Sequence, residues 1–370
     1  MSTLTKLAAT TALISATAAT TALAGGMEVG RFDPAFLYEE GNYAEISYSS
    51  RSPSVTDDVY APDSSMLSDF STMNGALKIN ISDRLSVGLT SFDAGRIALS
   101  YEGSGGPFAA IPYAELNPAL AALGNLPEPN VDLSFRSTAA VLKYSVTDRI
   151  DVYGGVKYTE GSATGNIITP VPGNITADSA SATSAIVGAS YSIPDIALRV
   201  AVTYQTAART SHDTTSDVLG PQVASMSGMP ESLTVDFQTG IAANTLLFGS
   251  IHHAKWADSN IEIGGVAVST WDNTTSFSMG VGRKINDNWS VSGSFNYEAA
   301  SEDSGTSLLS TTDGNQGVSL GARYSRDNMT VSLGANYTQF GDKTVTSLAG
   351  PGAFTDNSIM TYGVKVGFKF

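Results

Sequence analysis

The chain has no cysteine among its 370 residues, which excludes disulfide bonds and thiolate metal sites. It also has no run of about twenty uninterrupted apolar residues, the pattern of a membrane-spanning helix. Charged residues are scarce at 15%, and basic residues are the scarcer kind, with 20 Lys and Arg against 35 Asp and Glu. The formal net charge of −15 argues against nucleic acid as a partner, because its phosphates would be repelled.

Histidine is nearly absent as well, which leaves little for acid–base catalysis. The histidines are His212, His252 and His253. His252 and His253 are adjacent in a predicted strand and point to opposite faces, so they cannot act together as catalytic partners or as metal ligands. We therefore predict that the protein is not an enzyme and that it holds no metal and no cofactor.

Residues 1–24 have the features of a secretory signal peptide. Lys6 precedes a run of small and apolar residues that ends in Ala22-Leu23-Ala24, so we predict cleavage before Gly25. A run this short and this rich in Ala and Thr is a poor membrane anchor. If the mature protein lives in a membrane, it must therefore cross it as a β-barrel.

The feature that the chain does have is strict alternation of apolar with small or polar residues. From Ile359 to Phe370, apolar side chains fall on one face of a strand and Thr, Gly and Lys on the other, so one face suits lipid and the other suits water. Pairing this last strand with the first would close a barrel and remove both exposed edges. The terminal Phe370 also resembles the carboxy-terminal signature that the assembly machinery of bacterial outer-membrane barrels recognises.

Tight turns set the number of strands. Six short polar turns lie between alternating segments, at 81–85, 146–150, 194–195, 244, 285–289 and 326–328. Their twelve flanking strands, a first strand near 43–51 and the last one add up to fourteen. We predict an all-β fold, an antiparallel up-and-down transmembrane β-barrel over residues 43–370, with short periplasmic turns and longer outer loops. A secreted soluble β-sandwich is the competing class, but aromatic residues at the ends of the apolar stripes favour the barrel.

Residues 25–42 precede the first strand and carry an apolar cluster of Phe32, Phe36, Leu37 and Tyr38. Inside a membrane barrel, the lumen is the one place where these side chains can be buried. The segment is therefore predicted to be a short plug, formed around Phe32, Asp33, Pro34, Ala35 and Phe36.

The stretch from Gly30 to Tyr43 resembles the plug and first strand of the FadL/TodX-type outer-membrane transporters of hydrophobic compounds. Asp33-Pro34-Ala35 stands where that family usually has Asn-Pro-Ala. Met229-Pro230-Glu231-Ser232 and Trp256 are similar to the family's eighth and ninth strands. The resemblance implies passive uptake of hydrophobic or amphipathic small molecules such as long-chain fatty acids. A general diffusion porin and a structural or adhesive barrel remain as alternatives.

Two stretches allow more than one interpretation. In the family, a kink in the third strand opens the wall sideways, and the resemblance makes Asp93 and Gly95 the counterpart here; otherwise the strand simply ends there. The segment from Gly95 to Asn130 is too apolar for a loop in water, with a short helix predicted over Tyr113–Leu123. It either packs into the barrel mouth or offers a landing site for apolar molecules.

The place of a residue in the alternation of a strand, which we call its strand parity, assigns it to the lipid face or to the lumen. A Lys or Arg facing lipid near mid-membrane costs about 2–4 kcal/mol, so an inward position is favoured for Lys78, Lys157, Arg199 and Lys365, together with Glu45, Asp151, Asp236 and Glu298. These charges either brace one another or leave a basic residue free for a ligand. In the second case we expect Lys157 or Arg199 to receive the carboxylate of a fatty acid whose tail lies near Tyr153.

The predicted location is the outer membrane of a Gram-negative type of cell. The expected partners are outer-membrane lipid and lipopolysaccharide, a hydrophobic small-molecule substrate, and the barrel assembly machinery through the strand that ends in Phe370. We expect no nucleic acid as a partner.

Overall fold

The computed structural model describes residues 26–167, 173–216, 220–301, 304–347 and 350–370. The predicted signal peptide, residues 1–24, lies outside them. Within the described ranges, no helix has both the length and the apolar character needed to cross a bilayer.

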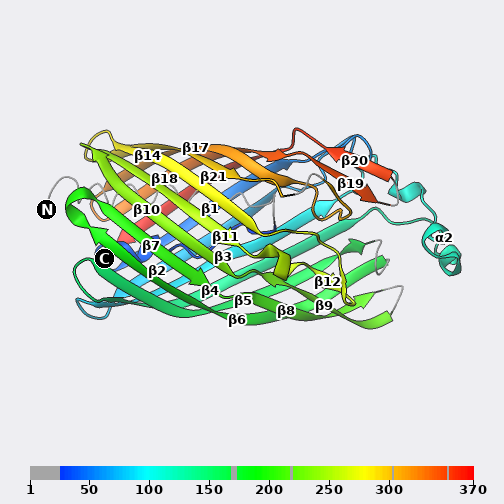
Figure 1. Cartoon of the computed structure of the whole chain (residues 1–370), viewed down its shortest axis with the longest axis horizontal. Coiled ribbons are helices and arrows are strands. Elements are labelled where there is room, and N and C mark those ends of the chain that lie inside the picture. The colour runs from blue at the N-terminus through cyan, green and yellow to red at the C-terminus, as the bar shows by residue number, and fades with distance from the viewer. Residues whose placement is uncertain (1–25, 168–172, 217–219, 302–303, 348–349) are drawn as a thin grey trace.

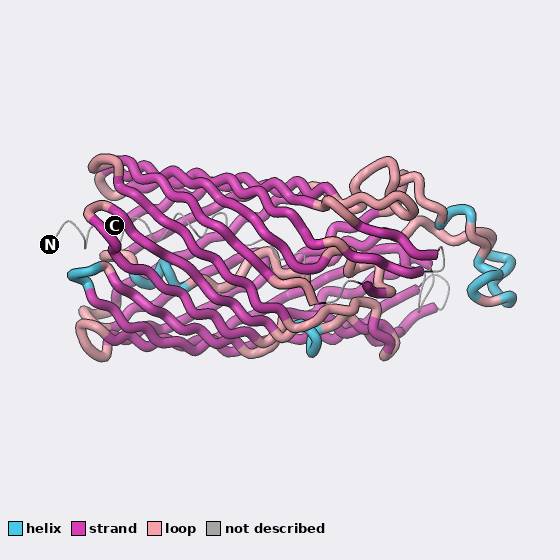
Figure 2. The backbone as a smooth tube through the Cα atoms, turned by 45° about the horizontal axis from the view of Figure 1, so that its top comes forward, coloured by secondary structure: helices cyan, strands magenta, loops and turns pink. Residues whose placement is uncertain are grey.

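Fourteen antiparallel strands close into a barrel, all tilted in the same sense (Figures 1 and 2). In order around the wall they are β1 (Tyr43–Ser54), β2 (Phe70–Asn80), β3 (Leu85–Ser100), β4 (Asn130–Ser145), β5 (Ile150–Ile167), β6 (Gly173–Ile193), β7 (Leu198–Gln205), β10 (Ser232–Ala242), β11 (Thr245–Ala254), β14 (Thr274–Lys284), β15 (Trp289–Glu298), β17 (Asp313–Arg326), β18 (Met329–Gly341) and β21 (Ser358–Lys369). β1 pairs with β21 from Tyr43↔Lys369 to Ser54↔Ser358, which closes the wall. The predicted fold class and strand number are confirmed.

The six predicted tight turns all join strands at the end of the barrel where β21 also finishes, which we call the turn end. Asn244 and Asp327 have positive φ angles of 58° and 53°, which their short polar side chains tolerate. Ala197, after the 3₁₀ turn η5 (Pro194–Ile196), takes φ 55° without such a side chain. The opposite end, which we call the loop end, carries the longer connections.

The loop end holds more regular structure than the sequence predicted. β5 and β6 continue far into the loop end. There β8 (Ala208–Ser216) and β9 (Gly220–Met229) form a hairpin, and β8 pairs with β6. These segments stay extended because alternation continues, with Ile175 and Ala177 buried. The remaining short strands of the loop end are β12 (Glu262–Ile263), β13 (Val266–Ala267), β16 (Ser304–Gly305), β19 (Lys343–Ser347) and β20 (Gly350–Phe354), with the 3₁₀ turn η6 (Trp256–Ser259).

The apolar segment between β3 and β4 is divided between packing and exposure. Phe108, in the 3₁₀ turn η3 (Phe108–Ala110), stacks on Tyr60 at a ring distance of 5.5 Å and is buried. The helix predicted over Tyr113–Leu123 is broken, because Pro118 lacks an N–H and Asn117 caps a new turn; α2 (Tyr113–Leu116) and η4 (Pro118–Leu123) project beyond the barrel (Figure 1). Leu123 is 46% exposed there.

The wall carries its apolar side chains outside and its polar ones inside. Leu320 is 71% exposed, whereas Lys78, Lys157 and Lys365 are 4–6% exposed and face the lumen as predicted. Exposed aromatic residues mark the apolar band, namely Tyr48, Tyr158, Tyr297, Tyr337 and Tyr362 toward the loop end, and Tyr144, Tyr191, Trp289 and Phe368 toward the turn end. A soluble sandwich would bury its apolar face, so this inverted arrangement fits a membrane barrel.

Candidate functional site

Residues 26–42, the N-terminal segment, lie inside the barrel. Met27, Phe32, Phe36 and Leu37 are each at most 2% exposed. The segment forms the 3₁₀ turn η2 (Pro34–Tyr38), which Asp33 caps by accepting the Ala35 N–H at 2.8 Å. The Asp-Pro pair sets this turn, since the carboxylate satisfies a free N–H and proline fixes φ at the first position.

The N-terminal segment binds to one edge of β3. The Val29 N–H donates to Ala94 O at 2.9 Å, and the Arg96 N–H donates to Met27 O at 2.9 Å. From the other side, Arg51 donates to Val29 O at 2.9 Å. Residues 27–29 thus occupy hydrogen-bonding positions on β3 that a neighbouring strand would normally fill.

β3 contains a β-bulge where the sequence pointed to a kink. Asp93 pairs with Arg136 and Gly95 with Phe135, so Ala94 is the extra residue. On its other side, β3 pairs with β2 only as far as Gly75↔Ser91. Contact resumes beyond the bulge with the chain just before β2, where the Ser68 N–H donates to Ala98 O at 2.8 Å. The backbone ladder of the wall is therefore interrupted between residues 70–74 of β2 and 92–97 of β3, a stretch that we call the seam.

Side chains replace the missing backbone bonds at the seam. The Met73 N–H donates to Asp93 Oδ2 at 3.0 Å, and the Asp93 N–H donates to Asn74 Oδ1 at 3.0 Å. Arg136 donates to both Met73 O, at 3.2 Å, and Asp93 Oδ1, at 2.8 Å. Asp93 of β3 and Arg136 of β4 thus both bond the Met73 backbone of β2, where β2 and β3 share no backbone hydrogen bond.

Substitution Gly30→Ala should loosen the N-terminal segment from β3. A Cβ at this position would lie 2.4 Å from the carbonyl oxygen of Asp93, which is backbone and cannot turn away. Such overpacking costs about 1–3 kcal/mol, so we expect the Val29 amide to exchange its hydrogen faster. Mass spectrometry measures this exchange. Gly293→Ala is the control, because the nearest atom to its Cβ is 3.8 Å away. Unchanged exchange at Val29 would contradict this docking.

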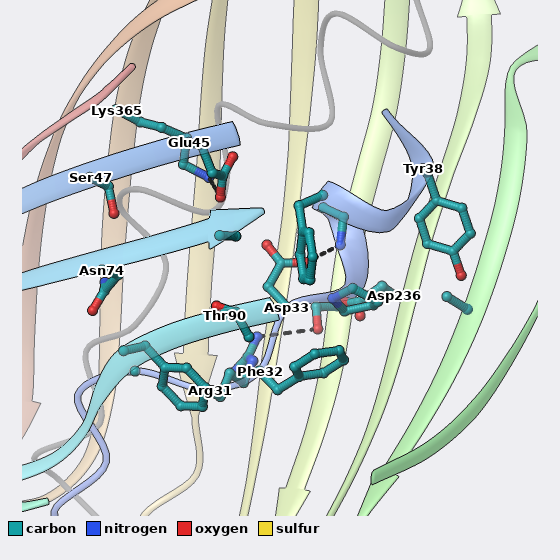
Figure 3. A pocket seen from close by; sticks show the side chains of 18 of the residues that line it. Arg31, Phe32, Asp33, Tyr38, Glu45, Ser47, Asn74, Thr90, Asp236 and Lys365 are labelled. Carbon is teal, nitrogen blue, oxygen red and sulfur yellow. Dashed lines mark hydrogen bonds and ion pairs between the residues drawn. The ribbon is translucent and has the colours of Figure 1, made fainter. Parts of the chain in front are cut away.

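A cavity of about 170 Å³ lies in the lumen between the N-terminal segment and strands β1, β2, β3, β7, β10, β11, β14 and β21 (Figure 3). Its charged lining residues are Arg31, Asp33, Glu45, Arg199, Asp236 and Lys365. Its inward-facing aromatic lining residues are Phe32, Phe36, Tyr38, Phe92 and Phe248. The site is thus both aromatic and charged, and its three basic and three acidic groups give it a formal net charge of zero.

The structure separates the residues that the sequence singled out for binding. Arg199 lines the cavity, where its guanidinium lies 4.2 Å from the ring centre of Tyr38 and donates to Gln238 at 3.2 Å. Lys157 instead donates to Gln205 at 2.9 Å and borders a much smaller space beside Glu28. Tyr153 packs against Phe32 at a ring distance of 6.4 Å.

Arg31 is a lining residue that strand parity missed. It lies on the N-terminal segment, outside any strand, so alternation gave no information about its direction. It donates to Ser250 at 3.4 Å, and Ser250 lies opposite Asp236 in the pairing of β10 with β11. The prediction that residues 25–42 form a plug in the lumen is the sequence signal that could have found it.

The histidines are bound in separate polar contacts. His252 faces the lumen, with Nε2 3.2 Å from Glu28 Oε2 and Nδ1 2.8 Å from Thr234 Oγ1, whereas His253 contacts Thr275. His212 is buried with Nε2 2.8 Å from Ser227 Oγ, a contact that sequence spacing did not show. Among the residues that the structure describes, no three His, Asp or Glu side chains gather in a way that could hold a metal ion.

No family model and no curated protein matches the sequence. Solved structures do match. A FadL homologue of Pseudomonas aeruginosa aligns at 12% identity over 96% of this chain and 98% of its own, with a TM-score of 0.71. The Pseudomonas putida toluene transporter TodX aligns at 13% identity over 96% and 97%, with a TM-score of 0.66, and the Ralstonia pickettii toluene transporter TbuX at 13% over 96% and 97%, with a TM-score of 0.60. The chain therefore has the fold of the FadL- and TodX-type transport channels over nearly its whole length.

Proposed function

We propose that the protein is an outer-membrane channel for the passive uptake of hydrophobic or amphipathic small molecules. The observation that carries this proposal is the seam, which adjoins a lumen occupied by the N-terminal segment. A molecule in the lumen can leave sideways into the membrane there without crossing an aqueous channel. The names of the matched toluene transporters support the same class of cargo.

The seam is held by few interactions. Three hydrogen bonds span it, from the Met73 N–H to Asp93, from the Asp93 N–H to Asn74 and from Arg136 to Met73 O, and each contributes about 0.5–3 kcal/mol. Opening the seam therefore requires the loss of these few hydrogen bonds rather than a complete ladder, and the Asp93–Arg136 pair between β3 and β4 stays intact. In this proposal, the bulge between Asp93 and Gly95 keeps β2 and β3 apart.

An open diffusion porin is less consistent with the lumen. The N-terminal segment fills part of it, and a barrel of fourteen strands is narrower than the porins of about 16–18 strands that leave an aqueous channel. We therefore propose that the segment acts as a plug. The long-chain fatty acid that the sequence favoured stays a prediction.

Uptake by whole cells tests the proposed function. In a bacterial strain without channels of this fold, cells that make the protein should take up labelled toluene or oleate faster than cells with an empty vector, because lipopolysaccharide slows both compounds. Purified protein in liposomes should conduct small ions poorly. High conductance without any gain in uptake of either compound would instead identify a porin.

A further inference from the structure

The lumen cavity has the size of one aromatic ring. Its volume is about 170 Å³, and an apolar cavity of about 150 Å³ in another protein is known to bind benzene. Phe32 and Phe36 meet edge to face at 6.2 Å on one side of it, and Phe92 and Phe248 line the wall. Aromatic side chains favour edge-to-face and offset contacts with a further ring.

The charges around the cavity are mostly not paired with one another. Lys365 and Glu45 form an ion pair at 3.2 Å. Among the described residues, the other four charged lining groups, Arg31, Asp33, Arg199 and Asp236, have no oppositely charged group within 4.0 Å. The cavity therefore presents both strong donors and strong acceptors to whatever enters it.

These groups discriminate between ligands of equal size. A hydrocarbon would separate the charged groups from water and give them no hydrogen bond. An anion would be attracted by Arg31 and Arg199 but repelled by Asp33 and Asp236. A hydroxyl group satisfies both kinds, because it donates to a carboxylate and accepts from a guanidinium.

We propose that the lumen cavity binds a single-ring aromatic molecule that carries a hydroxyl group, that is, a phenol. The ring lies among the phenylalanines, and the hydroxyl donates to Asp236 and accepts from Arg31 or Arg199. Asp236 is the acceptor because Asp33 already receives the Ala35 N–H. This inference rests on the proposed function and names the substrate class of the same channel.

Calorimetric titration of the purified full-length protein with phenol, toluene and benzoate tests the proposal, since the three ligands differ only in the substituent on one ring. We expect phenol to bind about tenfold more tightly than toluene and benzoate, a difference of about 1.4 kcal/mol. Toluene binding as tightly as phenol would overturn the proposal, and so would benzoate binding most tightly.

The variant Asp236→Asn sharpens the test because it removes one negative charge at constant size. Phenol should bind about five- to tenfold more weakly, whereas benzoate should bind more tightly to a lining that is now positive. Asp195→Asn, in the exposed turn before β7, is the matched control and should change neither affinity. If Asp236→Asn does not assemble, the comparison of the three ligands on the unaltered protein still decides.

The same cells used for the uptake assay separate the two hypotheses. If toluene or oleate is taken up but phenol has no advantage in binding, the phenol site is wrong and the channel stands. If neither compound enters faster than in empty-vector cells, the proposed function itself fails.

Discussion

Deletion of Ala94 should abolish uptake of hydrophobic compounds while leaving the barrel assembled. Ala94 is the extra residue between the Asp93↔Arg136 and Gly95↔Phe135 pairs, so its loss gives β3 a continuous register with β4. Without Ala94, the outward-facing Asp93 is followed directly by the inward-facing Gly95, so the alternation of faces continues without a break. A straight β3 can pair with residues 70–74 of β2, in place of residues 27–29, and close the seam. Uptake of labelled toluene and oleate by whole cells measures the effect.

The matched control is Ala94→Gly, which keeps the residue count and the bulge and should transport normally. Assembly of both variants is checked by electrophoresis. A folded barrel unfolds when the sample is heated beforehand, and the unfolded chain migrates more slowly. If the Ala94 deletion assembles and still takes up both compounds at the rate of the unaltered protein, the seam is not the route.

The barrel was predictable because its signals are local. The turn from Ile81 to Leu85 needs only short polar residues between two alternating segments, and a membrane forces each strand to turn one face to lipid. The inward position of Lys78 follows from the same parity. Strand number, closure and faces all derive from these two constraints, and each matches the structure.

The seam and the cavity were less predictable because their contacts join distant parts of the chain. The bulge at Ala94 breaks the alternation on which parity depends, so Asp93 and Gly95 were recognisable only as poor strand residues. The contact of Arg136 with Met73 O has no sequence signature. Lys157 and Arg199 both face the lumen, so strand parity does not distinguish them. Only the three-dimensional course of the N-terminal segment places Arg199 beside the cavity and Lys157 apart from it.

Removal of residues 27–37 should turn the protein into a leaky channel. Met27, Phe32, Phe36 and Leu37 fill part of the lumen, yet the fourteen wall strands close by pairing with one another and not through this segment. The deletion therefore leaves the strand pairings of the wall intact and replaces buried apolar side chains with water. We expect higher conductance in planar bilayers and entry of small polar solutes into proteoliposomes.

Deletion of η4, residues 118–123, is the control for this experiment. It removes a shorter stretch, six residues against eleven, that projects beyond the barrel and contains no buried residue, so conductance should not change. A chain without residues 27–37 that assembles but conducts no better than the full-length protein would show that the segment does not obstruct the lumen. The deletion also removes two acidic residues, Glu28 and Asp33, but only one basic residue, Arg31, so it should shift the selectivity of the opened channel toward anions.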